Sequence, residues 1–343
     1  MSEARSTGRI ARGLAAVAAG AVAGAVVEEV LARRVLRADA HAGADIRPPD
    51  GERRTITSFD GTAIHATTVG RRGAPPVILA HGIIESSAIW HYQARDPVLA
   101  DRYELIVYDA RGHGGSGAAR GPRGTTCFTS QAHARDLAAV IEAATNGPVV
   151  VVGHSMGGMA VQGLWDVASS ARERVAGAVL VNTTFTAELA GWRGEGSRPQ
   201  RAFERIEDLG QRVIGSERIV HRLRPGRSDL AMLGARLVYG RAPSQAHIAA
   251  SVRMYDATPS ATIAASVDLA TADLHHVLPH IDVPVLVVAG IHDRITPAWL
   301  SDEITARIPA AELVVLEGCG HAAPFERHEE LNGLIAKFCE RVL

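Results

Sequence analysis

The sequence contains little cysteine and carries almost no net charge. Its 343 residues include three cysteines, Cys127, Cys319 and Cys339, an odd number without metal-ligand spacing, so neither a disulfide framework nor a zinc site is indicated. A reducing compartment is therefore expected. The 36 basic and 37 acidic residues nearly cancel, so no overall field would attract nucleic acid, and we expect no nucleic-acid partner. With 47% hydrophobic and 21% charged residues, the chain can bury a sizeable core.

A long, strongly apolar run is also missing near the N-terminus. Residues 13–27 are uncharged and rich in Ala, Gly and Val, but a bilayer span needs roughly 20 apolar residues and alanine is only weakly hydrophobic. Acidic Glu28 and Glu29 follow the run, which fits a secretory signal poorly. Two interpretations stay open, a helix that packs on the domain or on a partner, and a membrane-surface segment over residues 10–37. We expect a cytoplasmic protein, or one associated with the cytoplasmic side of a membrane.

The most informative stretch is an apolar run that ends at a serine between glycines. Four valines, residues 149–152, are followed by Gly153, His154, Ser155, Met156 and Gly157. This pattern predicts a buried strand, a sharp turn and the start of a helix. Such a turn exposes the serine oxygen and places it at the positive end of the helix, where an oxyanion could form. The stretch therefore predicts a nucleophile site.

Strand and helix signals alternate along the chain on both sides of this turn. An Asp60-Gly61 hairpin signal separates the first two predicted strands, and a helix is expected from residue 131 to residue 144. The alternation predicts an α/β fold with a doubly wound, mainly parallel sheet. The other strands are expected at residues 54–59, 62–69, 77–80, 103–108, 175–181, 285–289 and 313–316.

The serine turn resembles the nucleophile elbow of the α/β-hydrolase family. His81-Gly82 after an earlier apolar strand is similar to the family's oxyanion loop, which implies that the backbone N–H groups of Ile83 and Met156 form the oxyanion hole. The segment from Asp109 to Ser116 resembles the family's D-x-R-G-x-G-x-S loop. There Asp109 and His113 are expected to be structural rather than catalytic.

The same resemblance assigns the other two catalytic residues. Asp293 occupies the carboxylate position of a G-x-x-D-x-x-x-P pattern after the strand at 285–289, and His321 lies in a glycine loop after the last strand. The resulting order Ser155, Asp293, His321 is the family's order. No metal or organic cofactor is implied.

The resemblance covers residues 54–340 and divides the chain into parts. It implies a catalytic core at 54–184 and 274–343 and an inserted helical lid at 185–273, while composition predicts an N-terminal helical segment at 1–40 and a linker at 41–53. Helical spacing within the lid is visible at 200–213, 229–239, 244–255 and 263–274. Candidates for its pocket face are Trp192, Phe203, Met232, Tyr239, Met254 and Tyr255, although such residues more often pack a small core.

These features together favour a serine hydrolase acting on a lipophilic or small carboxylic ester. Ser155 would attack the carbonyl, His321 would accept its proton and Asp293 would orient the imidazole. Perhydrolase or haloperoxidase-like, C–C hydrolase and thioesterase activities use the same triad and stay open. A ligand-binding protein on a hydrolase scaffold is the alternative from another functional class.

Overall fold

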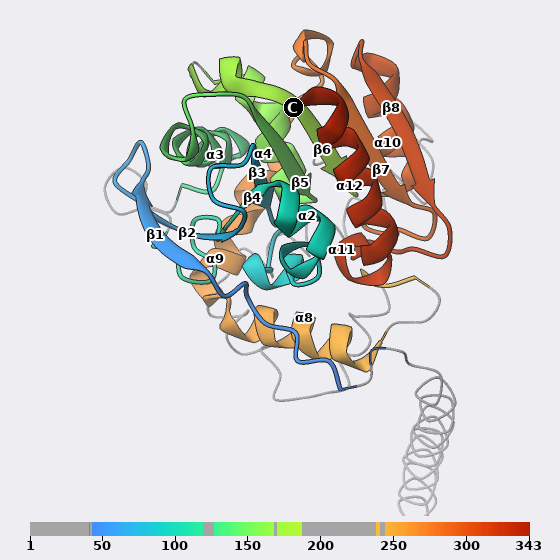
Figure 1. Cartoon of the computed structure of the whole chain (residues 1–343). Coiled ribbons are helices and arrows are strands. Elements are labelled where there is room, and N and C mark those ends of the chain that lie inside the picture. Colours follow the sequence, from blue (N-terminus) through green and yellow to red (C-terminus); the bar gives the residue numbers. More distant parts are fainter. Residues whose placement is uncertain (1–40, 42, 119–126, 168–169, 187–237, 241–243) are drawn as a thin grey trace, which may run out of the picture. The chain divides into compact units, whose positions relative to one another are not determined.

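The computed structural model describes residues 41, 43–118, 127–167, 170–186, 238–240 and 244–343. Its strands form a single eight-stranded sheet in the order β1-β2-β4-β3-β5-β6-β7-β8 (Figure 1). Strands β3 to β8 are parallel, whereas β2 pairs antiparallel with both β1 and β4. The strands are β1 Glu52–Thr57, β2 Ala63–Gly70, β3 Pro76–Ala80, β4 Glu104–Tyr108, β5 Val149–His154, β6 Val175–Val181, β7 Val285–Gly290 and β8 Ala311–Leu316.

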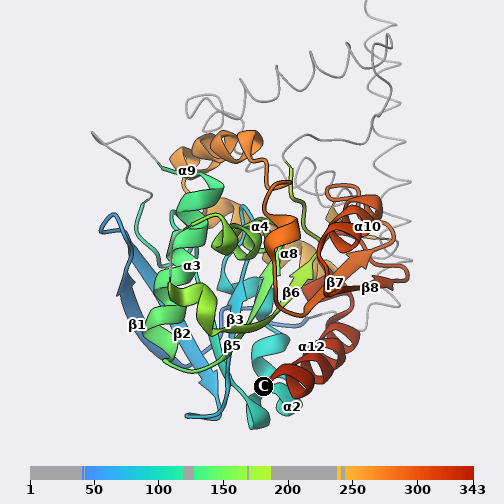
Figure 2. The same cartoon turned by 90° about the horizontal axis from the view of Figure 1, so that it is seen from above.

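Helices lie on both faces of the sheet (Figure 2). One face carries α2 and α12, and the other carries α3, α4 and α10. On β6, Gly177 lets α12 approach closely, because a Cβ at this position would lie 2.8 Å from the Phe338 ring. The described helices are α2 Pro97–Arg102, α3 Ser130–Ala144, α4 Met156–Gln162, α8 Gln245–Ala257, α9 Ser260–Ala265, α10 Ala298–Arg307, α11 Ala323–Glu326 and α12 His328–Val342.

The apolar runs of the sequence became central strands for a simple reason. Helices cover both faces, so β3, β5 and β7 are buried along their whole length and need no polar alternation. Strand β8, at the sheet edge, is only partly buried. The predicted doubly wound, mainly parallel sheet is therefore present. Strand β1 begins at Glu52, two residues before the predicted start, because the register with β2 extends to Thr68.

The loop after β4 is fixed by a buried ion pair. Arg111 is fully buried, and its Nε and Nη2 atoms each donate to a carboxylate oxygen of Asp136 on α3 at 2.7 Å. Asp136 also accepts a hydrogen bond from Ser58, which follows β1. A buried bidentate pair of this kind fixes the loop, because the hydrogen bonds between the two ions replace those that water would otherwise make.

Much of the predicted lid lies outside the described residues. Its two ends meet beside β6, where Thr186 and Asp273 form an antiparallel bridge and Leu274 N donates to Phe185 O at 2.7 Å. The segment between them thus leaves and re-enters the core at one place. Helices α8 and α9 belong to this segment. The predicted helices at 200–213 and 229–239, apart from residues 238 and 239, are outside the described part.

Residues 1–40, the predicted N-terminal helical segment, also lie outside the residues that the structure describes. Among the described residues, no helix combines the length and the apolar character needed to cross a membrane. All strands and the site residues discussed below belong to one compact unit.

Candidate active site

Ser155 stands at the sharp turn between β5 and α4. Its backbone has φ 52° and ψ −119°, a conformation that is costly for a non-glycine residue and that occurs mostly at functional sites. Gly153 is required here, because a Cβ would lie 2.5 Å from the backbone of Gly157. Thr183 Oγ1 donates to Ser155 O at 2.6 Å, so the turn is also held from the neighbouring strand.

Asp293 follows β7 and is 5% exposed. Its Oδ1 accepts the backbone N–H groups of Ile295 and Thr296 at 2.8 and 2.9 Å, and its Oδ2 accepts the Thr296 hydroxyl at 2.7 Å. Burial alone would raise the pKa of Asp293, but these bonds and the adjacent His321 lower it overall. The group is therefore a carboxylate at neutral pH.

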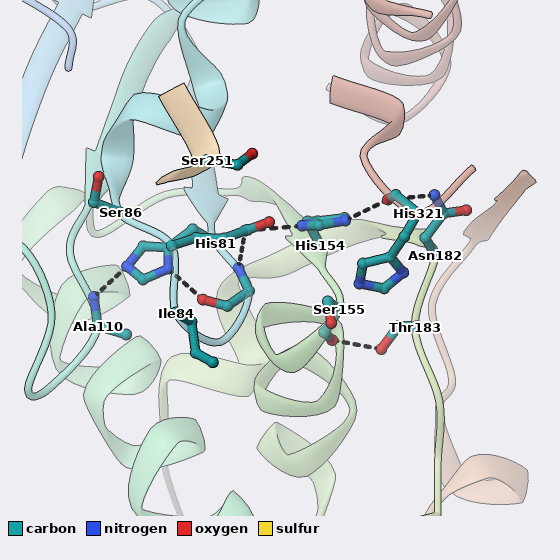
Figure 3. Close-up of polar contacts among 12 residues, drawn as sticks. His81, Ile84, Ser86, Ala110, His154, Ser155, Asn182, Thr183, Ser251 and His321 are labelled. Carbon is teal, nitrogen blue, oxygen red and sulfur yellow. Dashed lines mark hydrogen bonds and ion pairs between the residues drawn. The ribbon is translucent and has the colours of Figure 1, made fainter. Parts of the chain in front are cut away.

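His321 follows β8 and connects the other two positions. Its Nδ1 lies 2.8 Å from Asp293 Oδ2, and its ring is directed toward Ser155 (Figure 3). Within the described residues, the Ser155 hydroxyl makes no hydrogen bond to this ring, and such contacts often tighten only when substrate binds. The structure thus brings Ser155, Asp293 and His321 together at the carboxyl ends of β5, β7 and β8.

The two predicted oxyanion donors flank the serine. Gly82 lies so close that a Cβ there would be 3.0 Å from Ser155 Cβ, which places the following residue, Ile83, beside the nucleophile. Met156 is the first residue of α4, so its N–H has no acceptor within the helix. Among the described residues, no acceptor pairs with either N–H group, so both remain available to a ligand oxygen.

The side chains of Asp109 and His113 accept hydrogen bonds from backbone N–H groups and do not bond to Ser155. Asp109 accepts the N–H groups of Ser87 and Gly115 at 2.7 and 2.8 Å. His113 Nε2 accepts the N–H of Ile84 at 3.1 Å, and burial lowers the pKa of His113 to about 3, which keeps the ring neutral. Both residues therefore shape the oxyanion loop, in agreement with the structural role expected for them.

The predicted pocket residues fall into two groups. Tyr239 is fully buried, its hydroxyl lies 2.7 Å from Ser251 Oγ on α8, and its ring stacks on His247. Met254 is buried on α8 and Tyr255 is half-buried. Tyr239 thus packs in an aromatic cluster, the alternative weighed for such residues. Trp192, Phe203 and Met232 lie outside the described residues.

Several residues that hold the loops around Ser155 and His321 were not singled out from the sequence. Asn182, after β6, donates to His321 O at 2.7 Å and to Gly320 O at 2.9 Å, and its side-chain oxygen accepts the N–H of Gly290. Its φ of 43° indicates that tertiary bonds fix it in a strained conformation.

Glu326 on α11 links the histidine loop to residues 238–240, which lie within the predicted lid. Its carboxylate accepts the N–H groups of Gly240 and Gly320 at 2.7 and 3.0 Å. In addition, His321 N donates to Val238 O at 2.6 Å. The backbone of the catalytic histidine candidate is therefore bonded to the segment 238–240. Sequence alone gives no signal for backbone contacts of this kind.

The described residues contain no group of three His, Cys, Asp or Glu side chains arranged to hold a metal ion. Cys319 is fully buried beside the histidine loop, and burial strongly raises the pKa of its thiol. It is therefore a protonated, small core residue.

Comparison with known proteins agrees with this architecture. A protein of Mycobacterium tuberculosis named as a non-heme bromoperoxidase, BpoC, is 30% identical over 275 residues, which cover 77% of this chain and 93% of that protein. A pimeloyl-acyl-carrier-protein methyl ester esterase of Nitrosomonas europaea is 28% identical over 77% of this chain and 94% of its own length. The solved structure of a thermophilic esterase from Thermogutta terrifontis superposes with a TM-score of 0.67 at 25% identity, covering 85% of this chain and 99% of that one.

The family profile described as the alpha/beta hydrolase fold matches residues 75–328, which include the serine turn and both of its predicted partners. That match spans more than half of the chain and agrees with the mostly parallel sheet and its flanking helices. The chain therefore belongs to the α/β-hydrolase family.

Proposed function

We propose that this protein is a serine hydrolase that cleaves a carboxylic ester through Ser155, His321 and Asp293. The observation that carries the proposal is the pairing of His321 Nδ1 with a buried carboxylate at 2.8 Å while the ring faces a serine held at positive φ. A serine hydroxyl is a weak nucleophile at neutral pH and needs a base within reach. Asp293 fixes the proton on Nδ1, which leaves Nε2 free to accept the Ser155 proton.

The reaction proceeds through an acyl-enzyme. Ser155 Oγ attacks the ester carbonyl carbon, and His321 takes the hydroxyl proton. The N–H groups of Ile83 and Met156 stabilise the oxyanion, each donor contributing roughly 3 kcal/mol to transition-state stabilisation. The imidazolium returns its proton to the leaving alcohol, and water, deprotonated by His321, then releases the acid.

The substrate class is supported by the relatives and by the predicted lid. Relatives named as esterases point to an ester, and the insert begins after Phe185, two residues beyond Thr183, whose hydroxyl donates to Ser155 O in the serine turn. We therefore propose a small or lipophilic ester held under residues 185–273, with Trp192, Met232, Met254 and Tyr255 as candidate pocket residues. We further propose that residues 10–37 contact a membrane surface and that no cofactor or nucleic acid takes part.

One rival activity has specific support, because a relative of 30% identity is named as a bromoperoxidase. In such a reaction, hydrogen peroxide would replace water as the nucleophile that attacks the acyl-enzyme, and the product would be a peracid. The triad and the acyl-enzyme would be the same.

The decisive experiment combines a fluorophosphonate probe with a substrate panel. Wild-type protein should be labelled, and Ser155→Ala should lose both labelling and ester turnover while it stays folded, because the turn depends on its glycines. A panel of p-nitrophenyl esters of increasing chain length, run beside thioesters and with added peroxide, then identifies the substrate. An unlabelled, inactive wild type would indicate a binding protein instead. An active Ser155→Ala protein would exclude the proposed nucleophile.

A further inference from the structure

A second histidine and carboxylate pair lies beside the candidate triad. His154, the residue before the nucleophile, is fully buried, and its Nδ1 lies 3.0 Å from Glu85 Oε2 in the oxyanion loop. The Glu85 side chain is 14% exposed. The His154 ring centroid lies 4.9 Å from that of His321. Neither Glu85 nor His154 has a role in the mechanism above.

The two nitrogen atoms of His154 both face hydrogen-bond acceptors. Nε2 lies 2.8 Å from the carbonyl oxygen of His321, which can only accept, so Nε2 carries a proton. Nδ1 faces Glu85 Oε2, which already accepts the N–H of Gly82 at 2.7 Å. Because a carboxylate oxygen only accepts, Nδ1 must carry a proton as well to bond to it. The arrangement therefore suits an imidazolium paired with a carboxylate, whose opposite charges offset each other in a buried site.

The electrostatic surroundings favour the same charge state. Burial alone would lower the pKa of His154, but Glu85 raises it overall. Burial would likewise raise the pKa of Glu85, and the charge and hydrogen bond of His154 lower it overall. His81, His321 and Asp293 are the other titratable groups that act on the pair.

Each member of the pair holds one catalytic loop by its backbone. Glu85 binds Gly82 N, and His113 binds Ile84 N at 3.1 Å, so the residues on both sides of Ile83 are fixed and its N–H is directed. Ile84 has φ 59°, which is strained for a β-branched residue and needs such restraint. On the other side, His154 and Asn182 both donate to His321 O.

We propose that Glu85 and His154 act as positioning residues, a shared proton-bearing pair that couples the oxyanion loop to the backbone of the catalytic histidine. The pair forms one continuous line of hydrogen bonds from Gly82 to His321, passing through the residue next to the nucleophile. The inference rests on the proposed hydrolase function. It assigns these residues no contact with the substrate. Their effect is to keep the oxyanion donor and the base in register with Ser155.

Glu85→Gln is the sharpest kinetic test. The amide oxygen can still accept from Gly82, but the charge is lost, so His154 would no longer be stabilised as an imidazolium and would give up one of its two hydrogen bonds. We expect kcat to fall roughly 10- to 100-fold with little change in KM, because small misplacements of reacting groups cost rates of this order. Glu142→Gln, which neutralises an exposed carboxylate on α3, is the matched control and should change kcat less than about 2-fold.

A spectroscopic readout separates this positioning role from the proposed function. In the Ser155→Ala protein, NMR with ¹⁵N-labelled histidine should show His154 with protons on both ring nitrogens at pH 7.5. Glu85→Gln should convert it to a neutral ring. The resonances are assigned by their absence in His154→Gln.

The outcomes decide different claims. A neutral His154 ring, with the proton on Glu85 or elsewhere, would overturn the charged pair. Normal probe labelling combined with Glu85→Gln kinetics equal to those of Glu142→Gln would overturn the positioning role. A wild-type protein without labelling or turnover would instead refute the hydrolase function, and the NMR result would still report on the pair.

Discussion

Replacing Asp293 by Asn should leave the fold intact and remove most of the activity. Asp293 Oδ1 accepts two backbone N–H groups, from Ile295 and Thr296, and an amide oxygen can accept the same bonds. The new NH₂ group must therefore occupy the place of Oδ2, where it faces His321 Nδ1 and the Thr296 hydroxyl. An NH₂ group only donates, so His321 would have to present an unprotonated Nδ1 toward it.

The consequence is a wrong tautomer of the catalytic base. With Nδ1 unprotonated, the ring proton moves to Nε2, the nitrogen that should accept the Ser155 proton. The same substitution in a serine protease lowers kcat by about 10⁴. We expect a similar loss here, which corresponds to about 5 kcal/mol of transition-state stabilisation.

The assay is steady-state hydrolysis of a short p-nitrophenyl ester, with thermal unfolding measured in parallel. Thr296→Val is the matched control, because it removes one hydroxyl donor to Asp293 Oδ2 and leaves the carboxylate in place. The kcat of Thr296→Val should fall by about tenfold at most. If Asp293→Asn kept more than about a tenth of wild-type kcat with an unchanged melting temperature, the tautomer argument would be wrong, and so would the choice of Asp293 as the acid.

Four further predictions concern other residues and segments of the chain. Asp109→Asn should lower stability by about 1–3 kcal/mol with little effect on kcat, because one of the N–H groups of Ser87 and Gly115 would lose its buried acceptor; calorimetry and kinetics on one sample test this, and the reverse pattern would exchange the roles of Asp109 and Asp293. The free energy of unfolding that Glu85 and His154 contribute should be greatest between pH 4.5 and 6.5. Folding raises the pKa of His154, so its contribution is complete below pH 6.5 and is lost as pH rises through the pKa of the folded state. Folding lowers the pKa of Glu85, so its contribution is complete above pH 4.5 and is lost as pH falls through the pKa of the folded state. Urea unfolding of wild type and Glu85→Gln within this range and on both sides of it measures the difference, and a difference that did not shrink outside the range would contradict the linkage. If Met254 on α8 faces the pocket, Met254→Ala should change the rates on long-chain esters more than the rate on acetate esters. An equal loss of rate on all esters would instead mean that Met254 packs in the protein core. A protein starting at Asp45 keeps buried Ile46, whose carbonyl accepts from Arg253, and should match full-length activity but no longer sediment with anionic vesicles; equal sedimentation of both forms would refute the membrane role of residues 10–37.

The sheet and the serine turn could be predicted because their signals are local. A run of four valines buried on both faces specifies β5, and the glycines on either side of Ser155 are the residues that the turn requires sterically. Asp293 and His321 were predicted for a related reason. Each occupies a family pattern in the loop after a predicted strand, and parallel strands bring their carboxyl ends to one edge of the sheet.

The supporting contacts could not be predicted, because their partners are distant in sequence and are mostly backbone atoms. Glu85 and His154 are 69 positions apart, and His154 meets the carbonyl oxygen of a residue 167 positions away. Nothing in the sequence of the oxyanion loop distinguishes Glu85 from a solvent-exposed acidic residue. The left-handed conformation of Asn182 is equally invisible, since it arises from bonds to Gly290, Gly320 and His321.

These contacts share a property that bears on how the site works. Asn182, His154 and Glu326 each bond to backbone groups of the histidine loop, and within the described part of the chain none of the three makes a hydrogen bond to the His321 ring. A backbone bond fixes where a loop lies without constraining the chemistry of its side chain. The imidazole Nδ1 instead faces Asp293 Oδ2 at 2.8 Å and the Thr296 hydroxyl at 3.3 Å, so the tautomer of the ring and the position of its loop are controlled by separate groups. This separation explains why Asp293→Asn and Glu85→Gln should produce different defects, the first in the protonation state of the base and the second in its alignment with the oxyanion donors.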